Sequence, residues 1–218
     1  MLPVFKYSET IHSQNLLSRG NIRVGTLHDF RKAEHKKGIA DANEGKKQVS
    51  FNIPSANTDT LSEKQKKSFE QFGGFVMGKG VRANLTNFNQ IKSFNHQDCF
   101  IHCTSERYSA NTLAQFDKAD SCVEISDLEA FYEVLTRALN AITPVELMCV
   151  SRVHYKGRAE EWNGEDWGTH PALIKEPEFQ EQYEVRAIWR PKGDDVLSHI
   201  ILDEPGLIQF CRMRDLPI

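Results

Sequence analysis

The sequence has no hydrophobic run long enough to cross a membrane and no excess of basic charge. No stretch approaches the roughly 18 uninterrupted apolar residues that a membrane helix needs, and the first ten residues lack a basic region followed by an apolar one. The chain has 27 Lys or Arg residues and 30 Asp or Glu residues, and its formal net charge of −3 excludes a basic nucleic-acid coat protein. We therefore expect a soluble, cytoplasmic protein that does not associate with membranes.

Paired cysteines are absent as well. The five cysteines are odd in number, widely spaced and form no CxxC pair, which favours buried, reduced thiols over a disulfide framework. Metal-ligand residue types do crowd together between His96 and Cys103. A strand would place Cys99 and Cys103 on one face and His102 on the other, and no second Cys/His pair completes a zinc site. We predict no metal site, and we expect at least one of Cys99 and Cys103 to be buried together with Ile101.

The apolar residues that are present suffice for one substantial core. Hydrophobic residues make up 39% of the 218, including 13 Phe. We expect a single domain over residues 1–218 with a polar insertion at about 54–95, where a Lys- and Glu-rich segment is followed by glycines that favour a hairpin. No Lys-Ser or Lys-Thr follows these glycines, which excludes a P-loop.

Short segments with alternating polarity dominate the chain. They predict strands over 21–27, 48–53, 99–105, 121–125, 145–155 and 183–189, with 197–202 pairing to the last of these through a turn at 192–195. The stretch from 31 to 47 has no periodicity and is predicted to be a surface loop.

Two segments have helical spacing. The first covers residues 9–19 and is closed by Gly20. The second covers 128–142, starts from a capping box of Ser126 and Glu129, and stops before Pro144. Because helices and strands do not alternate regularly, the pattern indicates an α+β fold rather than a doubly wound one.

Polar residues gather where the apolar strand 183–189 begins. Alternation places Glu184 and Arg186 on one face, and Gln182 lies just before them. One interpretation is an exposed strand end with Glu184 and Arg186 paired at little energetic gain. The other is a reacting site, because loop-to-strand junctions often carry reacting groups.

Five short motifs, taken in order, carry a family resemblance. They are Phe5-Lys6-Tyr7, residues 21–31, Asp41 with Glu44-Gly45, Cys99 to Ser105, and Lys175 to Arg186. Together they resemble a family of bacterial proteins that is similar in fold and motif order to ADP-ribosyltransferases. In the arginine-serine-glutamate class of those enzymes, an arginine on the first strand, a Ser-Thr-Ser strand and a Gln-x-Glu loop follow one another. This chain has Arg23, Cys103-Thr104-Ser105 and Gln182-Tyr183-Glu184.

This resemblance implies split β-sheets with flanking helices, and NAD as a substrate. The implied NAD-binding residues are Arg23, Thr26, Thr104 and Ser105. Glu184 would stabilise the positive charge that develops on the ribose, and Gln182 would face the acceptor. The strands that carry Arg23, Ser105 and Glu184 should therefore border one cleft.

The chain departs from the pattern at one position and offers alternatives at another. Cys103 stands where the first serine of Ser-Thr-Ser would lie. Arg19 and Arg31 are close to Arg23 in the sequence and compete with it as the phosphate-binding arginine.

The expected function is NAD-dependent mono-ADP-ribosyl transfer to a macromolecule, either a nucleic acid or a protein, as in bacterial toxins and phage-defence effectors. An inhibitor protein is a further expected partner. The alternatives are an NAD glycohydrolase and a non-catalytic binding module with the same fold, and Cys103 favours the latter. Five lysines form a basic segment that either steers nucleic acid or is a solvated loop: Lys32, Lys36, Lys37, Lys46 and Lys47.

Overall fold

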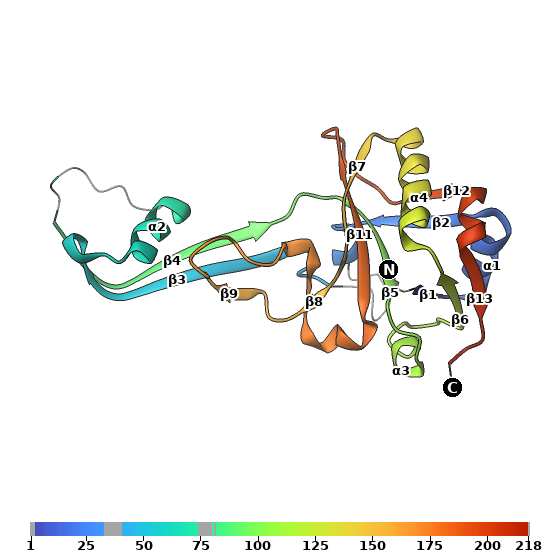
Figure 1. Ribbon diagram of the computed structural model, residues 1–218, viewed down its shortest axis with the longest axis horizontal. Helices are drawn as coiled ribbons and strands as arrows, with labels where there is room; N and C mark the ends of the chain where they lie inside the picture. Colours follow the sequence, from blue (N-terminus) through green and yellow to red (C-terminus); the bar gives the residue numbers. More distant parts are fainter. Residues whose placement is uncertain (1–2, 33–40, 74–79, 81, 218) are drawn as a thin grey trace.

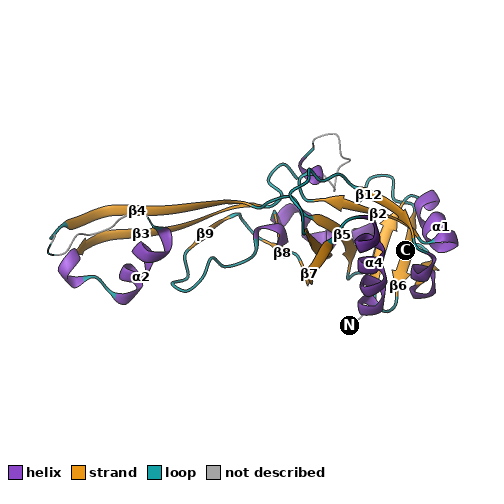
Figure 2. Cartoon of the chain, turned by 90° about the horizontal axis from the view of Figure 1, so that it is seen from above, coloured by secondary structure: helices purple, strands orange, loops and turns teal. Residues whose placement is uncertain are grey.

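The computed structural model describes residues 3–32, 41–73, 80 and 82–217 of the chain. Figure 1 shows a body of sheet and helices from which a long arm extends, and Figure 2 shows the same arm from above. The fold mixes helices with largely antiparallel strands, so the predicted α+β class is confirmed. Among the described residues, no helix is both long and apolar enough to span a membrane.

The body is built on an eight-stranded antiparallel sheet. Six strands follow the order β12-β2-β5-β1-β6-β13, while β11 pairs with β5 and β7 pairs with β11. Their bounds are β1 Val4–Ser8, β2 Asn21–Thr26, β5 Phe100–Ser105, β6 Ser121–Ile125, β7 Val145–Arg152, β11 Glu184–Pro191, β12 Ile200–Asp203 and β13 Cys211–Arg214.

Strand β5 has two different neighbours on one of its edges. Strand β11 runs along the whole of the other edge, with Glu184 opposite Ser105 and Arg186 opposite Cys103. On the first edge, β2 pairs only with Phe100 and Ile101, whereas β1 pairs only with Ser105. Strands β1 and β2 therefore diverge beside Cys103, and the sheet splits there.

Helix α4 (Leu128–Ile142) covers one face of the sheet with the apolar stripe that its sequence predicts. Its buried residues pack with strand residues such as Trp189 in the main core. The predicted capping box is wrong. The N-cap is Asp127, whose carboxylate accepts a hydrogen bond from Ala130 N (3.1 Å), while the Ser126 hydroxyl donates to Phe210 O (3.1 Å) because the segment leading into β13 lies alongside.

Helix α1 (Thr10–Arg19) ends at Gly20, as predicted. Gly20 has φ 69°, and a Cβ at this position would lie 1.9 Å from Glu204 O. Only glycine combines this backbone conformation with so close a neighbour. The turn at Gly20 sends the chain directly into β2.

The predicted pairing of 197–202 with 183–189 is wrong. Strand β12 pairs with β2 instead, with Ile201 opposite Arg23. Both edges of β11 are already occupied, one by β5 and the other by β7. The free edge of β2 is thus where β12 completes its hydrogen bonds.

The arm consists of β3 (Lys46–Asn57), α2 (Glu63–Phe72), β4 (Asn84–Asn95) and β9 (Ala159–Glu161). Strands β3 and β4 pair along their whole length and β9 adds to β3 in parallel. The arm has a hydrophobic core of its own, formed by Val49, Phe51, Ile53, Leu61, Phe69, Leu85 and Trp162. The region expected as a polar insertion at about 54–95 makes up the end of β3, α2 and β4, and residues 74–79 and 81 lie outside the described residues.

Short elements connect the rest. They are α3 (Ala110–Leu113), β8 (His154–Tyr155), β10 (Ile174–Lys175) and 3₁₀ turns at Asp29–Arg31, Thr58–Thr60, Pro171–Leu173, Pro177–Gln182 and Pro205–Phe210. The turn at Pro177–Gln182 leads through Tyr183, at φ 45°, straight into β11.

Candidate functional site

A cavity of about 680 Å³ lies where the sheet splits. Strands β1, β2, β5 and β11 and helix α1 all contribute to its wall. The strands of Arg23, Ser105 and Glu184 thus border one cavity, although these residues are up to about 160 positions apart in the chain. Its volume falls within the range of about 300–1,000 Å³ that small-molecule and cofactor sites occupy.

Glu184 lies in this cavity wall as part of a buried ion-pair network. Its carboxylate accepts hydrogen bonds from Arg186 Nε (2.6 Å) and Lys175 Nζ (3.0 Å). Glu184 is 5% exposed and Arg186 is 1% exposed. The interpretation of these two residues as an exposed strand end is therefore wrong.

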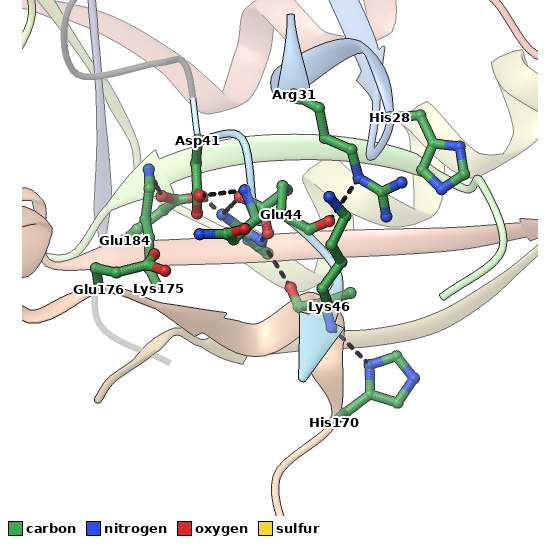
Figure 3. Close-up of polar contacts among 12 residues, drawn as sticks. His28, Arg31, Asp41, Glu44, Lys46, His170, Lys175, Glu176 and Glu184 are labelled. Carbon is green, nitrogen blue, oxygen red and sulfur yellow. Dashed lines mark hydrogen bonds and ion pairs between the residues drawn. The ribbon is translucent and has the colours of Figure 1, made fainter. Parts of the chain in front are cut away.

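Arg186 connects Glu184 to a second carboxylate. It donates to both oxygens of Glu44, at 2.7 and 2.9 Å, and also to Ala172 O at 2.7 Å. Figure 3 shows Glu44, Glu184 and Lys175 gathered in this cluster. Two carboxylates, one guanidinium and one ammonium thus compensate one another away from water.

The charges of this network fix its protonation. Burial alone would raise the pKa of the Glu184 carboxyl, but Arg186 and Lys175 outweigh it and hold that pKa well below its usual value. Burial and the adjacent Glu184 raise the pKa of the Cys103 thiol. Glu184 is consequently an anion at neutral pH, whereas Cys103 is a neutral thiol and a poor nucleophile.

Gln182 belongs to the same network. It is 1% exposed, and its Oε1 accepts a hydrogen bond from Lys175 Nζ at 2.7 Å. Gln182 and Glu184 therefore share one lysine as a donor. On the opposite side, the Tyr155 hydroxyl accepts a hydrogen bond from Glu184 N at 2.7 Å, which fixes the start of β11.

Arg23 lines the cavity from β2 but is partly in solvent. Its side chain is 40% exposed, and Nη2 pairs with Asp29 at 2.7 Å. Of its two competitors, Arg19 lines the cavity too and lies 3.6 Å from an Asp203 carboxylate oxygen. Arg31 does not line it, and donates to Glu44 O at 2.7 Å.

The three predicted hydroxyl ligands occupy different positions. Thr104 and Ser105 line the cavity, where Thr104 donates to Val185 O (3.3 Å) and Ser105 exchanges hydrogen bonds with the backbone of Arg107. Thr26 is buried and lies outside the residues that line the cavity, and its hydroxyl accepts from Asp29 N (3.2 Å).

A second ion cluster holds the loop that carries Glu44. Arg158 pairs with Asp41 (2.5 Å) and Glu176 (2.7 Å), and Glu44 N donates to Asp41 O (3.0 Å). Figure 3 shows Asp41 and Glu176 next to the site. This cluster fastens the start of the arm beside the cavity.

Comparisons with protein-family models, curated proteins and solved structures find no match. The function must therefore be inferred from the residues themselves. Within the part of the chain that the structure describes, no three His, Cys, Asp or Glu side chains are grouped to hold a metal ion. Cys99 is buried and Cys103 is half-buried, on the same side of β5 as Ile101, and both are free thiols, as expected.

The basic segment does not form one patch among its described members. Lys32 pairs with Asp29, Lys46 donates to Ala42 O, and Lys47 is buried and donates to the carbonyls of Trp167 and Thr169. Lys36 and Lys37 lie outside the described residues.

Sequence reasoning missed part of the polar wall of the cavity. The sequence places Glu44, Lys175 and Lys6 only within short motifs. It places Arg186 within a motif and in an expected surface pair with Glu184. The available signal was a charge inside an apolar strand, because Arg186 stands between Val185 and Ala187, both of which are buried.

Proposed function

We propose that the protein is an NAD-dependent mono-ADP-ribosyltransferase that modifies a macromolecule, as bacterial toxins and phage-defence effectors do. The observation that carries this proposal is the single cavity bordered by Arg23, Ser105 and Glu184. These residues come from β2, β5 and β11 and so keep the order arginine, serine, glutamate of the resembling enzymes, although Arg23 lies on the second strand and not on the first. The divergence of β1 and β2 from β5 supports a split-sheet fold of the same type.

The cavity has the chemistry that a dinucleotide requires. The residues that line it include Lys6, whose ammonium suits phosphate oxygens, and the aromatic residues Phe5 and Tyr7. Phe116 stacks on Tyr7 with ring centroids 5.8 Å apart and adds to these aromatic residues. Cations and apolar rings in one cavity match phosphates and bases in one ligand.

Glu184 would act on the reacting ribose. In the transfer, the bond from C1′ to the nicotinamide nitrogen breaks with its electron pair leaving on nicotinamide, and the acceptor attacks C1′ and loses a proton. Positive charge develops at C1′, and an ionised carboxylate stabilises it. Arg186 and Lys175 keep Glu184 ionised, and their two hydrogen bonds leave acceptor positions on the carboxylate for a ribose hydroxyl.

The position of Gln182 favours a second candidate, an NAD glycohydrolase. A Gln that selects a macromolecular acceptor needs its amide free, yet Gln182 is 1% exposed and accepts from Lys175. Water needs no such residue. The two candidates share the roles of Arg23 and Glu184 and differ only in the acceptor.

The test is incubation with NAD labelled in its adenylate part, with and without a cell lysate, followed by separate protease and nuclease treatments. A transferase puts label into material that one of the two treatments releases, and Gln182→Ala lowers this transfer more than the release of free ADP-ribose. A glycohydrolase yields labelled ADP-ribose alone, with or without lysate.

Glu184→Gln should lower NAD consumption roughly 100-fold or more in either case. The matched control is Glu124→Gln, because Glu124 is also buried and pairs with two arginines, Arg212 and Arg214, but does not line the cavity. The proposal is wrong if wild type consumes no NAD, or if the two variants consume it equally.

A further inference from the structure

Lys6 differs from the other cations that line the cavity. Four of the five Lys and Arg side chains in the wall have a carboxylate within 4 Å: Arg19, Arg23, Lys175 and Arg186. Lys6 has no such partner among the described residues, and its Nζ donates to a neutral acceptor, Cys103 O, at 2.8 Å. Of the five Lys and Arg residues in the wall, Lys6 is thus the one without a carboxylate within 4 Å among the described residues.

The position of Lys6 follows from the split in the sheet. Strand β1 pairs with β5 only at Phe5 and Ser105, so β1 leaves the Cys103 carbonyl to a side chain rather than to a backbone N–H. The Lys6 ammonium fills this place. An ammonium has three donors, and one is engaged by Cys103 O, so two remain for a ligand in the cavity.

Electrostatics favour an anion beside Lys6. The residues that line the cavity include five Lys or Arg side chains against four carboxylates, those of Glu9, Glu44, Asp117 and Glu184. Burial lowers the pKa of Lys6, which means that the cavity disfavours its charge in the absence of a partner. An entering anion would supply the missing counterion and is stabilised by the same low dielectric surroundings.

We propose that Lys6 binds the phosphate groups of a nucleotide in this cavity, and that it contributes more to phosphate binding than Arg23. Arg23 is 40% exposed and already paired with Asp29, so an added phosphate gains less from it. The aromatic residues Phe5, Tyr7 and Phe116 also line the cavity, and they favour a nucleotide over a simple anion. Identification of the nucleotide as NAD rests on the proposed function, whereas phosphate binding by Lys6 does not.

Titration calorimetry with ADP and with adenosine tests the inference. ADP should bind the full chain, and Lys6→Met should weaken that binding roughly 10-fold or more while leaving adenosine binding unchanged, because one charge-assisted contact is lost. Lys6→Arg should retain part of the affinity, and Arg23→Gln should weaken ADP binding less than Lys6→Met. The control is Lys66→Met, since Lys66 pairs with the exposed Glu63 on the arm and does not line the cavity.

A second measurement needs no variant. An amine-acetylating reagent is applied to the wild-type protein with and without ADP, and modified peptides are quantified by mass spectrometry. ADP should protect Lys6 and leave Lys66 equally reactive.

The inference is overturned if ADP does not bind, if Lys6 is not protected, or if Arg23→Gln weakens ADP binding more than Lys6→Met does. Its failure is distinct from failure of the proposed function. ADP binding through Lys6 without NAD consumption upholds the inference and refutes the function. NAD consumption with a KM for NAD that is unchanged in Lys6→Met upholds the function and refutes the inference.

Discussion

Removal of the Glu44 charge is expected to destabilise the protein strongly. Glu44 and Arg186 are both about 1% exposed in side chain and form two hydrogen bonds of 2.7 and 2.9 Å. In Glu44→Gln the amide oxygen can still accept one of these bonds, but Arg186 loses one of its two counterions. Loss of one partner from a buried pair costs about 3–5 kcal/mol, and because Glu184 still compensates Arg186 we expect about 3 kcal/mol.

Thermal unfolding followed by circular dichroism measures this effect. For a chain of this length, about 3 kcal/mol lowers the midpoint by roughly 6–12 °C. Glu63→Gln is the matched control, because Glu63 pairs with Lys66 at the same 2.7 Å but is 90% exposed in side chain. It should leave the midpoint unchanged. A Glu44→Gln midpoint within about 2 °C of that control would refute the reasoning.

Two further outcomes follow from buried polar groups and caps. His102 is buried, its Nε2 has no hydrogen-bond partner among the described residues, and burial holds its pKa well below the usual value. Below about pH 6.5 the unfolded chain takes up a proton at His102 that the folded chain does not. The free energy of unfolding, measured with urea, should therefore fall toward pH 5 by up to about 1.4 kcal/mol per pH unit, and His102→Gln should flatten this slope. Equal slopes in wild type and His102→Gln would contradict this prediction. At the start of α4, Asp127→Ala should lower the free energy of unfolding in urea by about 1 kcal/mol, and Ser126→Ala should lower it clearly less. The reverse order would support the capping box of Ser126 and Glu129 that the sequence predicts.

Local patterns predicted much of the fold. The stripe of α4, the closing Gly20 and the strand over Phe100–Ser105 depend on periodicity and backbone conformation, which neighbouring residues determine. The partner of β12 was not predictable in this way, because it depends on which sheet edge remains free once β5 and β7 have paired with β11.

The candidate site was also predicted only in part, because it depends on contacts between segments that are distant in the sequence. Alternation placed Glu184 and Arg186 on one face of a strand, but a charged residue is expected at the surface unless its partner is known. That partner, Glu44, is 142 positions away in the chain and lies in a stretch without periodicity. Likewise, Ser126 and Asp127 are both good cap residues, and only the packing of the Phe210 carbonyl on Ser126 decides between them.

The arm and the body of the molecule also differ in the order in which their strands can pair. Every β3–β4 pair joins residues within positions 46–95, so the arm can close its hairpin as soon as this stretch has left the ribosome. The body depends on distant segments, because β1 pairs with β5 and β6, and β5 pairs with β11. The cavity gains Glu184 and Arg186 only with β11, and the β2 edge is covered only with β12. During synthesis the β3–β4 hairpin should therefore precede a ligand-competent cavity by about a hundred residues, whereas the core of the arm is complete only once β9 and Trp162 have emerged.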